Sequence, residues 1–285
     1  MKDLFYSKRG VMIKKIAKKT IIYILLIFIS VIMLVPFAWM LVSSFKLNKD
    51  VFTYPIVWWP EEFITDNYVR IWEEIPLLRY FFNTAKLTVV ITLMQLLTST
   101  FAAYAFAKMK FPGKNFLFLS YICTIAMPWQ SYMIPQFIII RWLGLVDTHL
   151  SLIILQSFTA FGVFLVRQFY MEIPDEICEA ARIDGASEYG IYGRIMLPLS
   201  KPVIATLTIF SFTSTWNDFM GPLIYINSDK LKTIQLGLRS FISEYSSEYS
   251  LIMAGSVIAL IPVILVFACL QKYFVEGIAS TGLKG

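Results

Sequence analysis

The sequence predicts an all-α membrane protein with six transmembrane helices, and three observations support this. Of its 285 residues, 58% are hydrophobic and 15% are charged, whereas soluble domains average about a quarter charged. The charged residues cluster and leave uncharged windows near the ~20 residues that a helix needs to cross a bilayer. No window alternates with the period of two that a membrane β-barrel requires. Soluble enzymes, disulfide-rich secreted modules and nucleic-acid-binding proteins are therefore disfavoured.

The uncharged windows give the six predicted spans in order. They are Thr20–Phe45, Leu87–Ala107, Asn115–Ile140, Thr148–Val166, Pro202–Asn217 continuing past Asp218 to Ser228, and Tyr249–Gln271. Helices satisfy their own backbone polar groups, which makes them the open-chain way to span lipid. The predicted division is an N-terminal segment 1–19, a first span 20–45, an outer loop 46–82, a five-helix core 83–271 containing an inner loop 167–201, and a tail 272–285.

The basic residues indicate which side of the membrane the termini occupy. Seven Lys and Arg residues lie in the first 19 positions, directly before an apolar run. If that segment is cytoplasmic, the inner segments hold 16 Lys and Arg and the outer segments nine, in line with the positive-inside rule. The first window is too long for a signal peptide and no small-residue cleavage site follows it, so a retained helix is favoured. We expect both termini to be cytoplasmic.

The chemistry of ATP binding and of catalysis is absent from this sequence. A phosphate-binding loop requires Gly-x4-Gly-Lys-Ser/Thr, and the nearest approaches place Ile191 after Gly190 and Leu283 after Gly282. The three cysteines have no paired spacing, and the sole histidine, His149, has no ligand partner nearby in the sequence. We expect no catalytic residue, no metal site and no cofactor bound by this chain.

The inner loop 167–201 carries the most informative local pattern. Pro174 prevents the fourth span from continuing as a helix, and Asp175 is predicted to be an N-cap. Gly185 is predicted to end the first short helix, and a second can run from Ser187 to Met196.

Within the first of these helices, Ile177, Ala180, Ala181 and Asp184 share one face by their spacing. The two alanines would form a flat patch that another surface could approach closely. The plainer alternative is a solvated helix that lies on the membrane surface.

The spacing Glu179-Ala180-Ala181-x3-Gly185-x9-Ile195-x-Leu197-Pro198 resembles the loop found in permease subunits of binding-protein-dependent ABC importers. That resemblance implies a type I ABC importer permease fold. It also implies that the loop forms coupling helices that dock on a separate ATPase subunit, which would hold ATP and Mg. The coupling contact would fall on Glu179, Ala180, Ala181, Asp184 and Gly185.

Further segments narrow the resemblance to the second permease of maltose-type and multiple-sugar importers. These are Ala102–Ala107, Phe111–Lys114, Met127-Pro128, Ile134-Pro135, Leu143–Thr148, Trp216–Phe219 and the ending Gly277–Gly285. The implied partners are a second permease, two ATP-binding subunits and an extracytoplasmic sugar-binding protein. The implied location is the cytoplasmic membrane of a bacterium or archaeon.

Composition predicts that the tail 272–285 is flexible, because it is short, rich in glycine and weakly charged. In the family that it resembles, this tail reaches the interface of the two ATPase subunits. The matching residues here are Gly277, Gly282, Lys284 and Gly285.

The segment Trp216-Asn217-Asp218-Phe219 lies two-thirds along the fifth span, before Gly221-Pro222, which is expected to break the helix. Amide, carboxylate and aromatic groups in a membrane suit a sugar, so these four residues are candidates for the substrate pathway. Alternatively, Asn217 and Asp218 form hydrogen bonds to neighbouring helices or lie at the outer boundary of the membrane.

Three other functions compete with this one. A self-sufficient secondary carrier or channel would use Asp218 as its coupling site and would tolerate changes in the inner loop. An ABC permease for a non-sugar solute would share the same loop. An integral-membrane enzyme would need a catalytic set that the sequence does not contain.

Overall fold

The computed structural model describes the backbone of residues 2–242 and 247–282 and the side chains of 15–242 and 247–273. Over these ranges the chain is helical, apart from a single bridge between Ile242 and Ser247. It divides into two compact units. We call residues 1–71 with 241–257 the N-terminal unit, and residues 72–240 with 258–285 the core unit.

The N-terminal unit begins with one long helix, α1 (Lys2–Ser43), followed by a short 3₁₀ turn, η1 (Asn48–Asp50), and the start of α2 (Asn67–Glu74). The part of α1 from Lys15 to Ser43 is long and apolar enough to cross a membrane, and its central side chains are exposed. Lipid is the natural cover for such a surface.

A buried lysine fixes the chain where α1 ends. The Lys46 ammonium donates to the Val57 carbonyl oxygen at 2.5 Å and lies 4.2 Å from the centre of the Trp39 ring. The Asn67 amide donates to the carbonyl oxygens of Ser44 and Lys46. Burial lowers the pKa of Lys46 from its ordinary value, and the aromatic and carbonyl partners replace part of its lost hydration.

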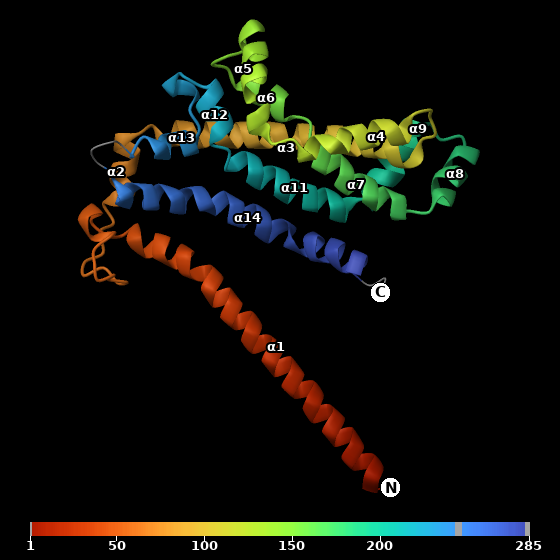
Figure 1. The fold of residues 1–285 in the computed structure, drawn as a ribbon, viewed down its shortest axis with the longest axis horizontal. Helices are drawn as coiled ribbons and strands as arrows, with labels where there is room; N and C mark the ends of the chain where they lie inside the picture. The colour runs from red at the N-terminus through yellow and green to blue at the C-terminus, as the bar shows by residue number, and fades with distance from the viewer. Residues whose placement is uncertain (1, 243–246, 283–285) are drawn as a thin grey trace. The chain divides into compact units, whose positions relative to one another are not determined.

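The core unit contains the remaining helices (Figure 1). They are α3 (Leu77–Lys108), α4 (Lys114–Cys123), η2 (Thr124–Ala126), η3 (Trp129–Ser131), α5 (Met133–Trp142), α6 (His149–Gln156), α7 (Ala160–Glu172), α8 (Asp175–Ile183), α9 (Glu188–Ile191), a π turn η4 (Tyr192–Met196), α10 (Leu197–Leu199), α11 (Lys201–Trp216), α12 (Met220–Tyr225), η5 (Asp229–Leu231) and α13 (Ile234–Arg239). The last helix, α14 (Tyr249–Gly282), begins in the N-terminal unit and ends in the core unit.

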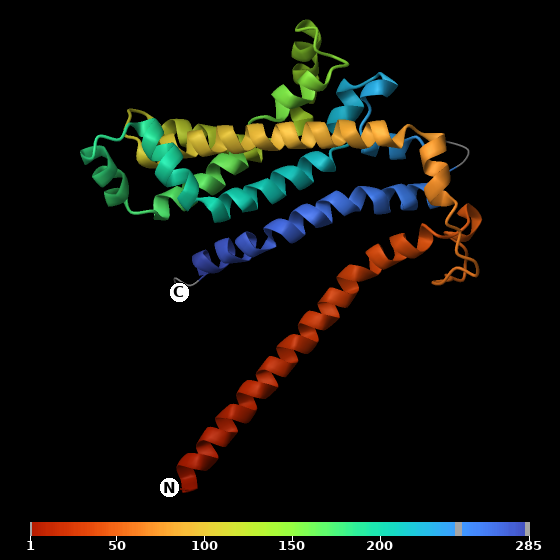
Figure 2. The same ribbon diagram turned by 180° about the vertical axis from the view of Figure 1, so that it is seen from behind.

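Helices α3, α7 and α11 lie side by side and form the centre of the core unit, as both views show (Figures 1 and 2). At one end of α3 they enclose an apolar cluster that includes Tyr104, Val166, Tyr170 and Leu207. At the other end, Leu87 and Ile91 pack with the α5, α6 and α12 segments. The α3 helix therefore links the two ends of the unit.

The first, second, fourth and sixth predicted spans fall on helical segments long and apolar enough to cross a membrane, whereas the third and fifth do not form single helices of that kind. The third window is split into α4 and α5 around Met127-Pro128, and the fourth into α6 and α7. The fifth continues from the inner loop through a 79° bend at Ser200. In the described range, four helices are long and apolar enough to cross a membrane, and there are five if the bent pair is counted as one span. Two further apolar helices are shorter.

The sixth predicted span corresponds to α14, which is long and apolar enough to cross a membrane and continues as a helix to Gly282. The backbone of residues 272–282 is therefore helical where composition alone favours an irregular tail. The segment Tyr273-Phe274-Val275 continues the apolar sequence, and extending a formed helix adds one hydrogen bond for each residue that is fixed.

The contact between α3 and α7 depends on Gly162. A Cβ atom at this position would lie 2.5 Å from Ser99 Oγ and 2.6 Å from Thr159 Cγ2. Small residues let membrane helices approach closely. We therefore expect Gly162→Val to destabilise the protein by about 1–3 kcal/mol, as overpacked cores do.

Thermal unfolding in detergent would measure this change. Gly193→Val is the matched control, because a Cβ at Gly193 meets nothing within 4 Å. Equal melting temperatures for the two variants would contradict the close approach of α3 and α7.

Candidate functional site

The predicted inner loop folds as two short helices joined by a tight turn. Gly185 adopts φ +82° directly after α8, which confirms it as the stop that the sequence predicts. Ser187 caps α9 by accepting from the Gly190 amide at 3.2 Å. The prediction for Asp175 is wrong: Pro174 holds the cap position, and Asp175 is the first helical residue.

Asp175 is instead committed to an ion pair with Lys108 at the end of α3. The Lys108 ammonium lies 2.5 Å from Asp175 Oδ1 and also donates to the Ile173 carbonyl oxygen at 2.5 Å. This hydrogen bond, with the attraction of the Lys108 charge, lowers the pKa of the Asp175 carboxyl. The pair joins the start of α8 to α3.

Glu188 makes a second link between the loop and α3. Its carboxylate accepts from the Tyr104 hydroxyl of α3 at 2.5 Å and from the Arg182 Nε of α8 at 2.7 Å. These two hydrogen bonds, that from Arg182 foremost, lower the pKa of Glu188. We call Tyr104, Lys108, Asp175, Arg182 and Glu188 the α3 clamp. None of the five belongs to the contact set predicted from the sequence.

The predicted coupling residues lie on opposite sides of α8. Cys178 and Ala181 face the core and are buried, whereas Glu179, Ala180 and Asp184 are exposed. The expectation that both alanines share one accessible face is therefore wrong. Positions 178 and 181 repeat with the helix and face the apolar cluster.

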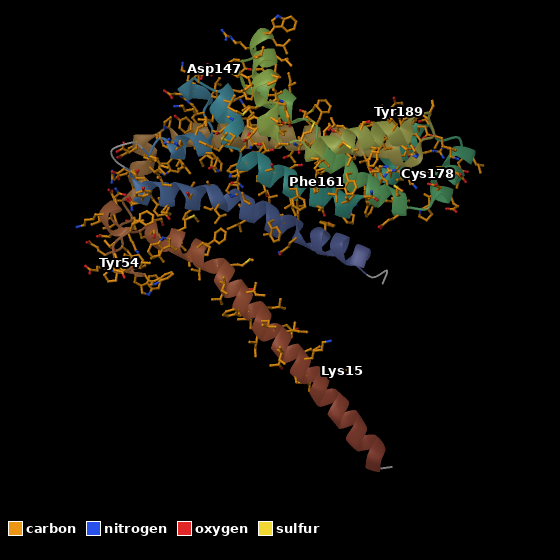
Figure 3. The ribbon with its side chains drawn as sticks, in the orientation of Figure 1. Lys15, Tyr54, Asp147, Phe161, Cys178 and Tyr189 are labelled. Atoms are coloured by element: carbon orange, nitrogen blue, oxygen red, sulfur yellow. The ribbon has the colours of Figure 1, made fainter. Side chains whose placement is uncertain are left out.

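The exposed side of the loop carries two large apolar side chains. Ile183 is 86% exposed and Tyr189 is 80% exposed, one on each side of the Gly185 turn. Figure 3 labels Tyr189 and the buried Cys178 at this end of the core unit. Exposed apolar groups rimmed by charged ones are typical of protein contact sites. We call Glu179, Ala180, Ile183, Asp184 and Tyr189 the loop surface.

The second site is a cavity of about 340 Å³ in the core unit. It lies where three helices are interrupted: at Trp129–Ser131 before α5, at 157–159 between α6 and α7, and at 217–219 between α11 and α12. Its lining includes Gln95, Trp129, Gln136, Gln156, Asp218 and Tyr225. Interrupted helices inside a membrane are tolerated where they line such a cavity.

Asp218 is the charged residue of this cavity, and its position is well defined. Oδ2 accepts from Gln156 Nε2 at 2.7 Å, and Oδ1 accepts from the Gly221 amide at 3.1 Å. A Cβ at Gly221 would lie 2.4 Å from Asp218 Oδ2, so a glycine leaves the space that the carboxylate fills. The Gln95 side chain donates to the Gln156 carbonyl oxygen at 2.7 Å and completes the network.

The structure separates Asp218 from the other three candidates for the substrate pathway. Trp216 is buried, donates to the Ala259 carbonyl oxygen at 2.9 Å and stacks on Phe212. Asn217 is exposed and donates to the Thr213 carbonyl oxygen, and Phe219 packs in the second apolar cluster. These three residues do not line the cavity.

Other details of the fifth span differ from expectation. The sequence predicts that Gly221-Pro222 breaks the helix, but the interruption lies earlier, at residues 217–219. Gly221 and Pro222 instead lie in the first turn of α12, where proline is tolerated. The amides of Gln95, Gln136 and Gln156 were not selected from the sequence. Their signal was available, since each is a side-chain amide inside one of the uncharged windows.

The C-terminal candidates fall at the end of the described chain. The backbone at Gly277 and Gly282 is helical, as part of α14. Lys284 and Gly285 lie outside the described residues. Their expected contact with an ATPase pair stays a prediction.

The loop after α5 is tied to the chain that follows α12 through Asp147, labelled in Figure 3. Its carboxylate accepts from the Asn227 amide at 2.9 Å and from the amide and hydroxyl of Ser228. These hydrogen bonds, that of the hydroxyl foremost, lower the pKa of Asp147 from 3.8.

The stability that Asp147 adds should therefore be present above pH 3.8 and be lost as the pH falls through its lower folded pKa. We expect Asp147→Ala to reduce stability near neutral pH and to have little effect once the wild-type carboxyl is protonated. Melting temperatures of both proteins from pH 6 to pH 3 measure this difference. A constant difference across that range would contradict the prediction.

These two sites, on a helical protein with several membrane-spanning segments, define a membrane transport subunit: a polar cavity lies among broken helices, and an ordered loop presents a contact surface. Residues 95–280 match the family described as the binding-protein-dependent transport system inner membrane component. The chain belongs to this family of ABC importer permeases.

Individual relatives agree with this family. The chain is 33% identical over 261 residues to the arabinooligosaccharides transport system permease protein AraQ of Halalkalibacterium halodurans, covering 90% of this chain and 94% of the relative. It is 29% identical over 246 residues to the lactose transport system permease protein LacG of Rhizobium radiobacter, covering 86% and 89%.

A solved structure is also similar. It is that of a bacterial ABC transporter involved in the import of the acidic polysaccharide alginate. The TM-score is 0.77 at 26% sequence identity, and the match covers 88% of this chain and 94% of that chain. The type I permease fold implied by the sequence is therefore confirmed.

Proposed function

We propose that this chain forms one half of the membrane pathway of a binding-protein-dependent sugar importer. A second permease would supply the other half, and two separate subunits would bind ATP and Mg and hydrolyse the nucleotide. An extracytoplasmic sugar-binding protein would deliver the solute. Relatives named for arabinooligosaccharide and lactose transport support the sugar assignment.

The loop surface is the observation that carries the proposed coupling to an ATPase. Glu179, Ala180 and Asp184 are exposed around Ile183, and Gly185 sets the turn beside them. The α3 clamp supports the other side of the same loop. A partner that moves the loop surface would therefore also pull on α3, which reaches the cavity at Gln95.

The proposed location is the cytoplasmic membrane of a bacterium or archaeon, with both termini and the loop on the cytoplasmic side. The excess of Lys and Arg in the segments 1–19, 108–114, 167–201 and 272–285 supports this orientation. Cysteine labelling from either side at Asp184→Cys and Asp229→Cys tests it. We expect only Asp184→Cys to be labelled from the cytoplasm.

Purification of this chain from its native membrane tests the assembly. We expect an ATPase and a second multi-span permease to co-purify, and ATP hydrolysis by the reconstituted complex to rise with the binding protein and its sugar. If the chain instead purifies alone and moves solute in liposomes without ATP, it is a secondary carrier, and Asp218 becomes its candidate coupling residue.

A further inference from the structure

The cavity offers hydrogen-bonding groups that its own walls do not use. Asp218 accepts hydrogen bonds from the Gln156 side chain and from the backbone amides of Gly221 and Met220, and a carboxylate can accept about four. Gln156 Oε1 and Gln95 Oε1 accept no hydrogen bond from the described residues. The three side chains therefore present free acceptors toward the same space.

Aromatic groups form another part of the same wall. The Trp129 indole and the Tyr225 hydroxyl both donate to Gln136 Oε1, at 2.9 and 3.1 Å, which holds the two rings in place. Tyr132 also lines the cavity and is 38% exposed. Fixed aromatic faces beside amide and carboxylate acceptors suit a saccharide, whose hydroxyls donate hydrogen bonds and whose C–H faces are apolar.

The charge of the lining discriminates between saccharides. The Asp218 carboxyl is the one acidic group of the lining, and none of the residues that line this cavity is Lys or Arg. An ionised Asp218 would repel an anionic solute, and the lining offers no cation to pair with that solute. Like charges brought together in a partly dehydrated cavity repel strongly.

We propose that this cavity is a subsite for one unit of an uncharged saccharide, and that Asp218 and Gln156 determine its selectivity against acidic saccharides. This inference rests on the proposed sugar import. The proposed solute differs in charge from the acidic polysaccharide alginate, in whose import the structurally similar transporter is involved.

Binding to the complete transporter in nanodiscs, without the binding protein, tests the proposal directly. The neutral probes are arabinotriose and maltotriose, the acidic probe is trigalacturonate, and calorimetry measures the affinities. We expect the wild type to bind at least one neutral probe at least tenfold more tightly than trigalacturonate. Asp218→Asn should reduce that ratio severalfold or more, because it removes the repelling charge.

Gln156→Ala supplies a second variant that removes a different group from the same wall. We expect it to weaken binding of the neutral probe at least threefold. Gln130→Ala is its matched control, since Gln130 is an exposed amide beside Trp129 that does not line the cavity. Membrane levels and assembly with the ATPase would be measured for every variant.

Three results would overturn the proposal. The first is tight binding of trigalacturonate by the wild type. The second is an unchanged selectivity in Asp218→Asn, and the third is equal behaviour of Gln156→Ala and Gln130→Ala. In all three cases saccharide-stimulated ATP hydrolysis would leave the proposed sugar import standing, whereas a transporter whose ATPase responds to no saccharide, neutral or acidic, would overturn both.

Discussion

Gly185→Asp is expected to reduce coupled uptake severely while leaving the chain inserted and assembled with its second permease. Gly185 adopts φ +82°, and a Cβ built on it meets no atom within 4 Å. The chain itself has room for the new side chain, and a left-handed residue costs roughly 1–2 kcal/mol. A larger functional loss would therefore support the proposed contact of this turn with an ATPase subunit.

The new carboxylate would stand directly beside Asp184, at the centre of the loop surface. A loss of about 1.4 kcal/mol in docking lowers the affinity tenfold, so we expect uptake to fall by at least about that factor. The measurements are sugar uptake in membrane vesicles and the amount of ATPase that co-purifies. Basal ATP hydrolysis by whatever complex remains should no longer respond to the sugar.

Gly193→Asp is the matched control for this substitution. Gly193 belongs to the same loop, is exposed and has ordinary backbone angles, and a Cβ at this position would also have no neighbour within 4 Å. The variant should retain most uptake. Equal uptake by the two variants, at equal membrane levels, would remove the Gly185 turn from the coupling contact.

Glu188→Ala is expected to uncouple ATP hydrolysis from uptake without removing the ATPase. Glu188 lies on the inward side of the loop, where its carboxylate joins Tyr104 of α3 to Arg182 of α8. The Arg182 and Glu188 side chains are more than a third exposed, so their ion pair contributes only ~1 kcal/mol. The hydrogen bond from the hydroxyl of the buried Tyr104 to a charged acceptor adds about 1.5 kcal/mol.

Together these contributions amount to about 2.5 kcal/mol, which corresponds to a factor of roughly 60, so we expect the number of sugar molecules imported per ATP hydrolysed to fall by up to about that factor. A defect in folding alone would lower uptake and hydrolysis in parallel, so this ratio separates positioning from stability. Glu188→Gln, which keeps an acceptor for Tyr104, should recover part of the ratio. Glu172→Ala is the control, since Glu172 is an exposed glutamate at the end of α7. An unchanged ratio in Glu188→Ala would refute a coupling role for the clamp.

Much of the fold could be predicted from the sequence because the positions of the spans depend mainly on the hydration of charged residues. Charged residues are costly in hydrocarbon, so their distribution limits where spans can lie. The stop at Gly185 and the cap at Ser187 are also local, because each depends on a single residue and its neighbours. These features were predicted correctly for that reason.

The breaks inside the spans were not predictable in the same way. The interruption at 217–219 coincides with a bond between Asp218 and Gln156, which are 62 positions apart. Likewise, the link between Tyr104 and Glu188 spans 84 positions. Such pairs depend on how helices pack, and neither hydropathy nor local propensity contains that information. The inward turn of Ala181 is a similar case, since the identical Ala180 beside it faces out.

Helix α3 runs without a break between the cavity and the clamp, so it connects the two sites rigidly. Gln95 touches the cavity network and Tyr104 the clamp, nine residues apart, which at 1.5 Å per residue is about 14 Å of rigid helix. In the proposed mechanism, a displacement of the clamp would reach the cavity through this helix, because α3 has no break between the two positions. A flexible insertion between Gln95 and Tyr104 would therefore separate ATP hydrolysis from movement at the cavity, although each site would remain intact. Mutations that compensate for a weakened clamp should fall along this same segment of α3.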